Sequence, residues 1–261
     1  FMTAWYDIDL DGYPELFVVH DFGQVRQSQL LHNQGGTAFV LDPDSHFHPD
    51  YEGMGLAVAD LNNDLKPDFL ETSWKQLSLL QSAPSGLALS KWSWLVDYAL
   101  SRGLAVDIEE PNHQYYGWGT ELGDLDNDGD ADAAVNFGFW STYAATERWQ
   151  EDEVWLQDAL GHFQPIADEW GMNDNGTGRG LIFADFNGDG WLDVLKRELE
   201  GTTPFYLSRC DNSGHYAMVE LRDDRTDNTF GVGATIIIEI GPTTKYVRWL
   251  DSGSTSLHTG G

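Results

Sequence analysis

A nine-residue acidic segment occurs four times along this chain of 261 residues. The copies begin at Asp7, Asp60, Asp124 and Asp185, so 53, 64 and 61 residues separate successive first positions. Each copy carries an acid or amide at positions 1, 3 and 5 and an acid at position 9. A motif that returns at a nearly constant period predicts a repeat architecture in which each period is one structural unit.

The spacing of oxygen-bearing side chains predicts a cation site in each segment. Ca2+ binds six to eight oxygens in flexible geometry, and positions 1, 3, 5 and 9 with the backbone carbonyl at position 7 can supply them. Mg2+ ranks second because it needs near-ideal octahedral geometry and keeps its waters. No Cys or His lies within any segment, which argues against zinc. We therefore expect up to four Ca2+ ions. The predicted ligands are Asp7, Asp9, Asp11, Tyr13, Glu15, Asp60, Asn62, Asp64, Lys66, Asp68, Asp124, Asp126, Asp128, Asp130, Asp132, Asp185, Asn187, Asp189, Trp191 and Asp193.

Two other structures share this acidic pattern. An EF-hand loop needs Glu at position 12 and flanking helices. Position 12 is acidic only at Glu71, and the flanking residues are typical of strands. The other interpretation is four Asx-rich turns that bind no metal. Four copies in register, each with an acid at position 9, favour the metal-binding interpretation.

The four segments are not equivalent. The third has five Asp residues and a Gly, so we expect it to bind most tightly. The second has Leu65 at position 6, where the other copies have Gly. A sharp turn at this position requires a left-handed backbone, which costs a non-Gly residue about 1–2 kcal/mol. We expect the second site to be the weakest, or its loop to be distorted.

Further features of the period predict short strands. Three segments follow a Gly-x-Gly pair: Gly53/Gly55, Gly117/Gly119 and Gly178/Gly180. Downstream, residues 31–39 and 156–163 each combine a strand with a turn containing Asn or Asp, Gly and Phe, and residues 80–86 are a weaker copy. About four strands then fill each period, which is typical of a β-propeller blade. Solenoid coils usually have shorter periods.

The segments, the Gly-x-Gly pairs and the Asn/Gly/Phe turns resemble FG-GAP/VCBS repeats, as in integrin α-subunit propellers. Residues 216–221, 228–240, 245–249 and 252–256 resemble the strand, the Asn-x-x-Gly-x-Gly-Ala strand, the next strand and the Gly/Ser-rich turn of a UnbV/ASPIC domain. The order of these features, with the acidic repeats first and the UnbV/ASPIC-like strands after them, is similar to that in the cartilage acidic protein group.

This resemblance implies an all-β fold of four-stranded antiparallel blades with Ca2+ loops. It places a partial propeller of about four blades at residues 1–212 and a UnbV/ASPIC-like β domain at residues 213–261. The full family fold has seven blades, and Met2 stands where the second Gly of a first Gly-x-Gly pair is expected. We expect both ends to be cut, with further blades upstream or on another chain.

Composition agrees with a metal-binding role. The net charge is −29, and four bound Ca2+ ions would change it to −21. The remaining negative charge disfavours nucleic acids and anionic membranes as partners, and no apolar run predicts a membrane span. Cys210 is the single cysteine, so no internal disulfide forms, and we expect it to be a small packing residue. Sites of this type suit an extracellular, cell-surface or periplasmic location, where Ca2+ is plentiful.

The sequence contains no nucleophile elbow, P-loop, His-Glu-x-x-His or Cys-x-x-Cys motif. We interpret residues 109–110 and 151–153 as solvated loop acids and His46/His48 as an exposed pair rather than a second metal site. The predicted function is a non-enzymatic, calcium-binding protein-interaction or assembly subunit. The alternative is a carbohydrate-binding module or glycan-active enzyme on the same scaffold.

Eleven Trp residues could serve packing or recognition. We expect Trp5, Trp118 and Trp191, which lie beside the acidic segments, to pack between blades. For five others, which lie in the less regular stretches of the sequence, two interpretations stay open, namely packing between blades or exposure for sugars or a partner protein. These are Trp92, Trp94, Trp140, Trp149 and Trp155. The insertions at 92–116 and 139–154 are our candidate partner surfaces.

Overall fold

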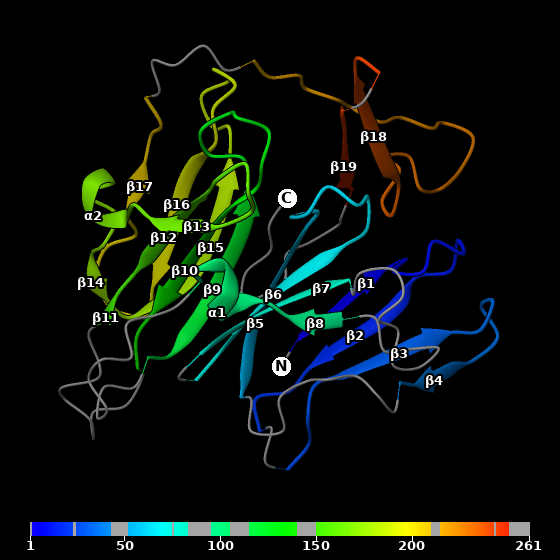
Figure 1. Cartoon of the computed structure of the whole chain (residues 1–261), viewed down its shortest axis with the longest axis horizontal. Helices are drawn as coiled ribbons and strands as arrows, with labels where there is room; N and C mark the ends of the chain where they lie inside the picture. The colour runs from blue at the N-terminus through cyan, green and yellow to red at the C-terminus, as the bar shows by residue number, and fades with distance from the viewer. Residues whose placement is uncertain are drawn as a thin grey trace.

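The structure is a computed structural model of the chain, and it describes residues 2–22, 25–42, 52–74, 76–82, 95–104, 115–139, 150–209, 215–242 and 244–250. Within these residues the chain forms antiparallel β-sheets and two short helices (Figure 1). The expected all-β fold is confirmed at this level.

Four sheets follow one another along the chain, and in each the strands pair in chain order. Sheet 1 contains β1 (Met2–Tyr6), β2 (Glu15–Val19), β3 (Gln29–Asn33) and β4 (Phe39–Leu41). Sheet 2 contains β5 (Gly53–Ala59), β6 (Asp68–Ser73), β7 (Leu77–Ser82) and β8 (Leu95–Asp97). Sheet 3 contains β9 (Gly117–Gly123), β10 (Asp132–Phe137), β12 (Glu153–Gln157) and β13 (Phe163–Pro165). Sheet 4 contains β15 (Gly178–Ala184), β16 (Asp193–Glu198) and β17 (Phe205–Tyr206). Four strands per period therefore hold for three sheets, and the described part of the fourth has three.

The remaining elements are small. β11 (Gln150–Glu151) pairs with β14 (Asn175–Gly176), and β18 (Thr235–Ile240) forms a hairpin with β19 (Thr244–Trp249). The helices α1 (Ala99–Arg102) and α2 (Ala167–Trp170) each span four residues and end at a left-handed Gly. None of the described helices has the length and apolar character needed to cross a membrane.

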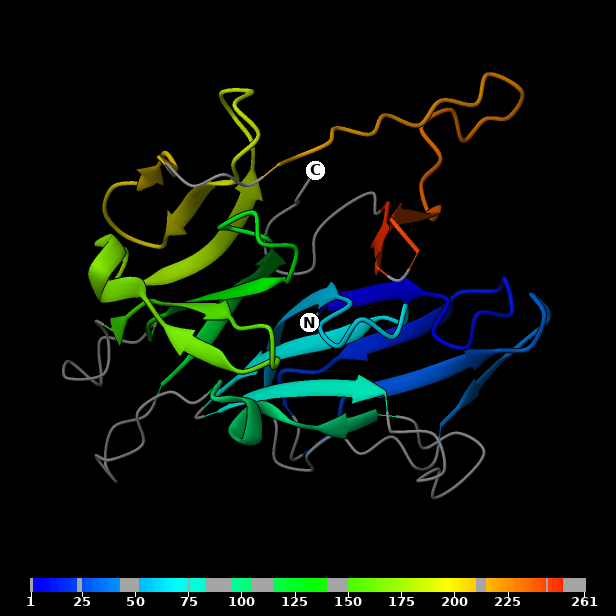
Figure 2. The ribbon, with the colours of Figure 1, turned by 45° about the horizontal axis from the view of Figure 1, so that its top comes forward.

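Glycine allows the first strands of neighbouring sheets to pack closely. β5, β9 and β15 lie side by side where the sheets converge (Figures 1 and 2). A Cβ atom at Gly119 would lie 2.9 Å from the backbone of Gly180, and one at Gly55 would overlap the carbonyl oxygen of Trp118. The Gly-x-Gly pairs thus mark the strands whose backbones face the next sheet.

A hydrophobic cluster fills each space between successive sheets. Sheet 2 contributes to two of them because its side chains alternate between its faces. Phe69 and Leu80 point into the cluster shared with sheet 1, and Leu70 and Leu79 into the cluster shared with sheet 3. A third cluster, which includes Val194, joins sheets 3 and 4. Burial on both faces makes each inner sheet dependent on its neighbours.

The C-terminal region only partly follows the sequence prediction. The hairpin β18–β19 covers two of the predicted strands, but residues 216–221 form no strand and are largely exposed. The prediction of a strand there is wrong, since this segment belongs to none of the sheets that the described residues form. The ring of Trp249 meets Tyr6 edge to face, with 6.4 Å between ring centroids.

The tryptophans divide between packing and exposure. Trp118 is buried as expected, with the Arg179 guanidinium 4.0 Å from its ring centroid, and Trp191 is half-buried. Trp155 is buried in the cluster between sheets 2 and 3, so it is not a recognition residue. The expectation for Trp5 is wrong, since it is 54% exposed. The remaining predictions of this kind lie outside the described residues. They concern Trp92, Trp94, Trp140, Trp149, His46, His48, Glu109, Glu110, Cys210 and residues 252–256, together with most of the insertions at 92–116 and 139–154.

Candidate calcium-binding loops

Each acidic segment forms the turn between the first and second strand of its sheet. Loop 1 (residues 7–15) joins β1 to β2, loop 2 (60–68) joins β5 to β6, loop 3 (124–132) joins β9 to β10, and loop 4 (185–193) joins β15 to β16. The same motif therefore occupies the same place in four consecutive structural units. The repeat inferred from the spacing is a repeat in three dimensions.

One hydrogen-bond pattern shapes all four turns, and loop 3 illustrates it. The Asp124 carboxylate accepts hydrogen bonds from the backbone N–H groups of Asp128 and Gly129, both at 3.0 Å. Asp126 accepts from the Asp128 N–H at 3.1 Å, and Asp128 from the Asp130 N–H at 2.9 Å. The side chains at positions 1, 3 and 5 are thus fixed by the backbone of positions 5, 6 and 7. The position-1 acceptors in the other loops are Asp7, Asp60 and Asp185.

The backbone at position 6 is left-handed in every loop. Gly12, Gly129 and Gly190 have φ of 90°, 103° and 88°, as the sharp turn requires. Leu65 adopts the same conformation, with φ of 66°, and its N–H still donates to Asp60 at 2.9 Å. Loop 2 is therefore not distorted, and that alternative is wrong. Its backbone instead carries the strain of about 1–2 kcal/mol of a left-handed non-Gly residue.

Position 4 is also left-handed, which the sequence analysis missed. Leu10, Asn63, Asn127 and Gly188 have φ of 60°, 58°, 57° and 77°. Asn tolerates this conformation better than most residues, so Asn or Gly at position 4 was the available signal.

The acid at position 9 links each loop to the third strand of its sheet or, in loop 4, to Ser208 just after that strand. Asp132 is buried, and its two oxygens accept the N–H groups of Leu125 at 2.7 Å and Gln157 at 2.9 Å. One donor is position 2 of the loop and the other lies on β12. The position-9 acids of the other loops, Glu15, Asp68 and Asp193, are equally buried and have equivalent donors.

Burial without a counter-charge raises the pKa of several of these acids. It raises the pKa of Asp132 to about 8 and that of Asp68 to about 7, against hydrogen bonds from backbone N–H groups that lower both. Burial likewise raises the pKa of Glu15 to about 7 and that of Asp124 to about 6, and neighbouring carboxylates add to both shifts. A divalent cation among these groups would favour their charged forms, so the electrostatics fit a cation.

The carboxylates converge most closely in two loops. In loop 3, one oxygen from each of Asp124, Asp126 and Asp132 lies within 4.8 Å of the others. Asp7, Asp9 and Asp11 of loop 1 form a similar group. Loops 2 and 4 have Asn62 and Asn187 at position 3, so an amide oxygen replaces one carboxylate there. The position-7 residues Tyr13, Lys66, Asp130 and Trp191 each donate an N–H to the position-5 acid at 2.8–3.0 Å.

Consecutive loops contact one another. The Asn63 side chain of loop 2 donates to Asp130 of loop 3 at 3.4 Å, and the Asn127 side chain of loop 3 donates to the Gly190 carbonyl of loop 4 at 3.1 Å. Both donors are position-4 residues. The left-handed conformation at position 4 therefore coincides with a contact between neighbouring structural units.

The C-terminal segment covers two of the loop glycines. The Tyr246 hydroxyl lies against Gly129 of loop 3, and the Tyr216 ring lies against Gly190 of loop 4. In both places the aromatic group occupies the space that a side chain at the glycine would need. Glycine at position 6 thus permits this contact as well as the turn.

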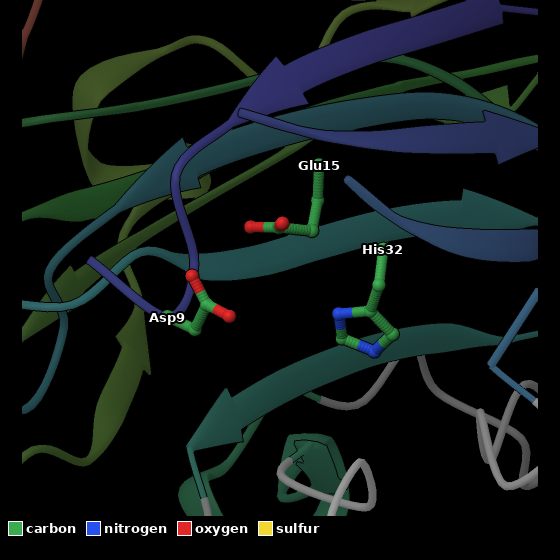
Figure 3. Close-up of side chains that lie close together, drawn as sticks. All are labelled: Asp9, Glu15 and His32. Atoms are coloured by element: carbon green, nitrogen blue, oxygen red, sulfur yellow. The ribbon is translucent and has the colours of Figure 1, made fainter. Parts of the chain in front are cut away.

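Sequence reasoning also missed a histidine beside loop 1. His32 lies on β3, and one of its ring nitrogens lies within 4.8 Å of carboxylate oxygens of Asp9 and Glu15 (Figure 3). No His occurs within the loop itself, so only the strand register could have placed one there. The absence of nitrogen ligands therefore holds for the nine-residue segment but not for the residues packed against loop 1.

A second acidic cluster has a different character. Asp152 was expected to be a solvated loop acid, but it is buried and accepts hydrogen bonds from the Asn136 side chain and the Phe137 N–H at 2.9 and 2.6 Å. The Lys196 amine lies 2.5 Å from Asp152 and also contacts Asp174. The lysine supplies the positive charge that such a cluster needs, so this group is a buried ion-pair network.

Comparisons with known proteins agree with the repeat. A family model described as FG-GAP-like repeat matches residues 7–70 and 141–195, which include loops 1, 2 and 4. The chain is 23% identical over 232 residues to cartilage acidic protein 1 of Mus musculus, an alignment that covers 86% of this chain and 33% of the relative. The chain thus spans about a third of that protein's length. Two stretches of this chain are thus similar to FG-GAP-like repeats.

Proposed function

We propose that this chain is part of a calcium-stabilised β-propeller that acts outside the cell, on its surface or in the periplasm, as a protein-interaction or assembly module. The observation that carries the proposal is the common geometry of the four loops. Each gathers side-chain oxygens around one turn and ties that turn to a buried position-9 acid. Residues 213–261 are proposed to be a UnbV/ASPIC-like domain.

Calcium fits these loops better than other common ions. Except at loop 1, the ligand atoms come from carboxylates, amides and backbone carbonyls, and their number suits the flexible coordination of Ca2+. A bound Ca2+ would supply positive charge to buried acids and so stabilise the charged form of each loop. The protein's own residues hold the loop shape through the N–H groups of positions 5, 6 and 7.

The propeller and its location rest on the repeat. Three hydrophobic clusters between four successive sheets suit blades packed around an axis. FG-GAP-like repeats, and a relative named for cartilage and for acidity, support an extracellular role for this chain, whose net charge is −29.

A non-enzymatic role is favoured because the clustered carboxylates already have partners in the proposed ion sites or in an ion pair. The loop carboxylates belong to the proposed ion sites, and the Asp152 network contains its own cation, Lys196. The carbohydrate-binding alternative keeps one supporting observation, namely that Trp5 is exposed beside Phe39, with 5.6 Å between the ring centroids. A glycan array that detects a specific sugar would favour this alternative.

The test is calorimetric titration of the chelator-stripped chain with Ca2+, together with thermal unfolding in Ca2+, Mg2+ and EGTA. We expect up to four bound Ca2+ and a melting temperature that EGTA lowers and Ca2+ restores better than Mg2+. Asp128→Asn should remove one site, whereas Asp224→Asn, on the exposed surface outside the loops, should change nothing. An unchanged melting temperature in EGTA would refute calcium stabilisation.

A further inference from the structure

The first structural unit, loop 1 with its sheet, differs from the other units at two residues that face each other, Glu15 and His32. It has Glu15 at position 9, where the other loops have Asp. Leu16 pairs with Leu31 across β2 and β3, so His32 stands opposite Glu15. The residues at the equivalent place in sheets 2, 3 and 4 are Gln81, Leu156 and Leu207. The imidazole is therefore peculiar to the first structural unit.

The histidine ring is buried and points at the loop acids. His32 is 3% exposed and Glu15 is 1% exposed. Figure 3 shows the Nδ1 edge of the ring turned toward the Asp9 and Glu15 carboxylates, which come from the loop and from the start of β2. The ligand atoms of all three residues lie within 4.8 Å of one another.

Asp42 fixes the orientation of this ring. Its Oδ2 lies 3.2 Å from His32 Nε2, and the residue is itself 3% exposed. A carboxylate on one ring nitrogen is the usual partner of a histidine whose other nitrogen binds a metal, because it sets the tautomer and raises the basicity of the ligand. With Nε2 held at Asp42, Nδ1 is the ring nitrogen that faces Asp9 and Glu15.

We propose that loop 1 binds a first-row divalent transition ion, such as Zn2+ or Co2+, through Asp9, Glu15 and His32. Imidazole with carboxylates suits these ions, whereas Ca2+ takes oxygen ligands. Glu15 is one methylene longer than Asp, which lets its carboxylate reach toward the ring. The inference rests on the proposed function only in that loop 1 is a metal loop, and it makes this loop chemically distinct from loops 2 to 4.

The experiment uses Co2+ as a probe on the whole chain. The protein is stripped of metal, saturated with Ca2+ and then titrated with Co2+, and the visible d–d absorption is recorded. We expect about one equivalent of Co2+ to bind despite the excess Ca2+, and Zn2+ to displace it. His32→Gln, which copies Gln81 of the second unit, should weaken Co2+ binding at least tenfold and change the spectrum. His162→Gln, at an exposed turn, is the matched control and should change neither.

The outcomes separate this inference from the proposed function. If Ca2+ stabilises the chain but the Co2+ spectrum does not depend on His32, or if Ca2+ displaces all Co2+, the nitrogen site is refuted and the calcium loops stand. If Ca2+ has no effect while one Co2+ binds through His32, the proposed function fails and this inference stands. If His32→Gln unfolds, Asp42→Asn replaces it and should weaken Co2+ binding by a smaller factor. An unchanged affinity in a folded Asp42→Asn variant would refute the assigned orientation.

Discussion

Glu71 should make this protein less stable as the pH rises. It lies on β6, is 1% exposed and accepts a hydrogen bond from Ser28 Oγ at 2.8 Å. Burial raises the pKa of its carboxyl from 4.5 to about 7, and the Ser28 hydrogen bond lowers it only in part. We expect Glu71→Gln, which is neutral at every pH, to remove this dependence.

The sign and size follow from linkage. Below the unfolded-state pKa of about 4.5, Glu71 is protonated in both states and has no pH-dependent effect. As the pH rises toward 7, the unfolded chain ionises while the folded one keeps its proton, so folding stability falls. A shift from 4.5 to about 7 corresponds to about 3 kcal/mol at 1.36 kcal/mol per pKa unit. Glu71→Gln should therefore match the wild type at pH 4.5 and exceed it by about 2–3 kcal/mol at pH 8.

The assay is urea unfolding of both proteins from pH 4.5 to pH 8.5 in saturating Ca2+. The difference between the two unfolding free energies isolates Glu71, because the other acids are common to both chains. Glu169→Gln is the control, since Glu169 is exposed on α2. A difference that stays flat with pH, or a wild type that gains relative stability as the pH rises, would refute the reasoning.

Three further predictions concern the loops. Leu65→Gly should raise the free energy of unfolding of the Ca2+-loaded protein, measured in urea, by a net ~0.5–1 kcal/mol, because relief of left-handed strain exceeds the flexibility that Gly adds to the unfolded chain. Gly12→Leu should lower this free energy, and variants as stable as the wild type would contradict the prediction. Gly190→Ala should destabilise the protein more than Gly188→Ala, since both glycines have positive φ but only Gly190 lies against an aromatic ring, that of Tyr216. Protease cleavage within residues 215–250 should therefore be faster in Gly190→Ala than in Gly188→Ala. Asp132→Asn should cost about 1–3 kcal/mol in urea unfolding, because an amide cannot accept both backbone N–H groups; a loss below 0.5 kcal/mol would mean that the link is unimportant.

Local patterns predicted the four turns and their flanking strands because each turn is built from nine consecutive residues. The turn, the position-6 backbone and the strands on either side follow from residue spacing, turn chemistry and alternation. The strand register was not available from spacing alone, so His32, 17 residues after Glu15, went unseen. Asp152 was misjudged for a similar reason, since its partner Lys196 lies 44 residues away on another sheet. Contacts between sheets depend on how repeats stack, which no single repeat encodes.

The contacts of Tyr246 with Gly129 and of Tyr216 with Gly190 have a thermodynamic consequence. The same turns that would hold ions also support the C-terminal segment, so the two equilibria are linked, and linkage is reciprocal. If bound ions strengthen the seating of this segment by some factor, the seated segment strengthens ion binding by the same factor. A molecule that lifts the segment from loops 3 and 4 would then release ions, and a fall in ion concentration would loosen the segment. Through Tyr216 and Tyr246, the seating of the C-terminal segment would then depend on the ion concentration.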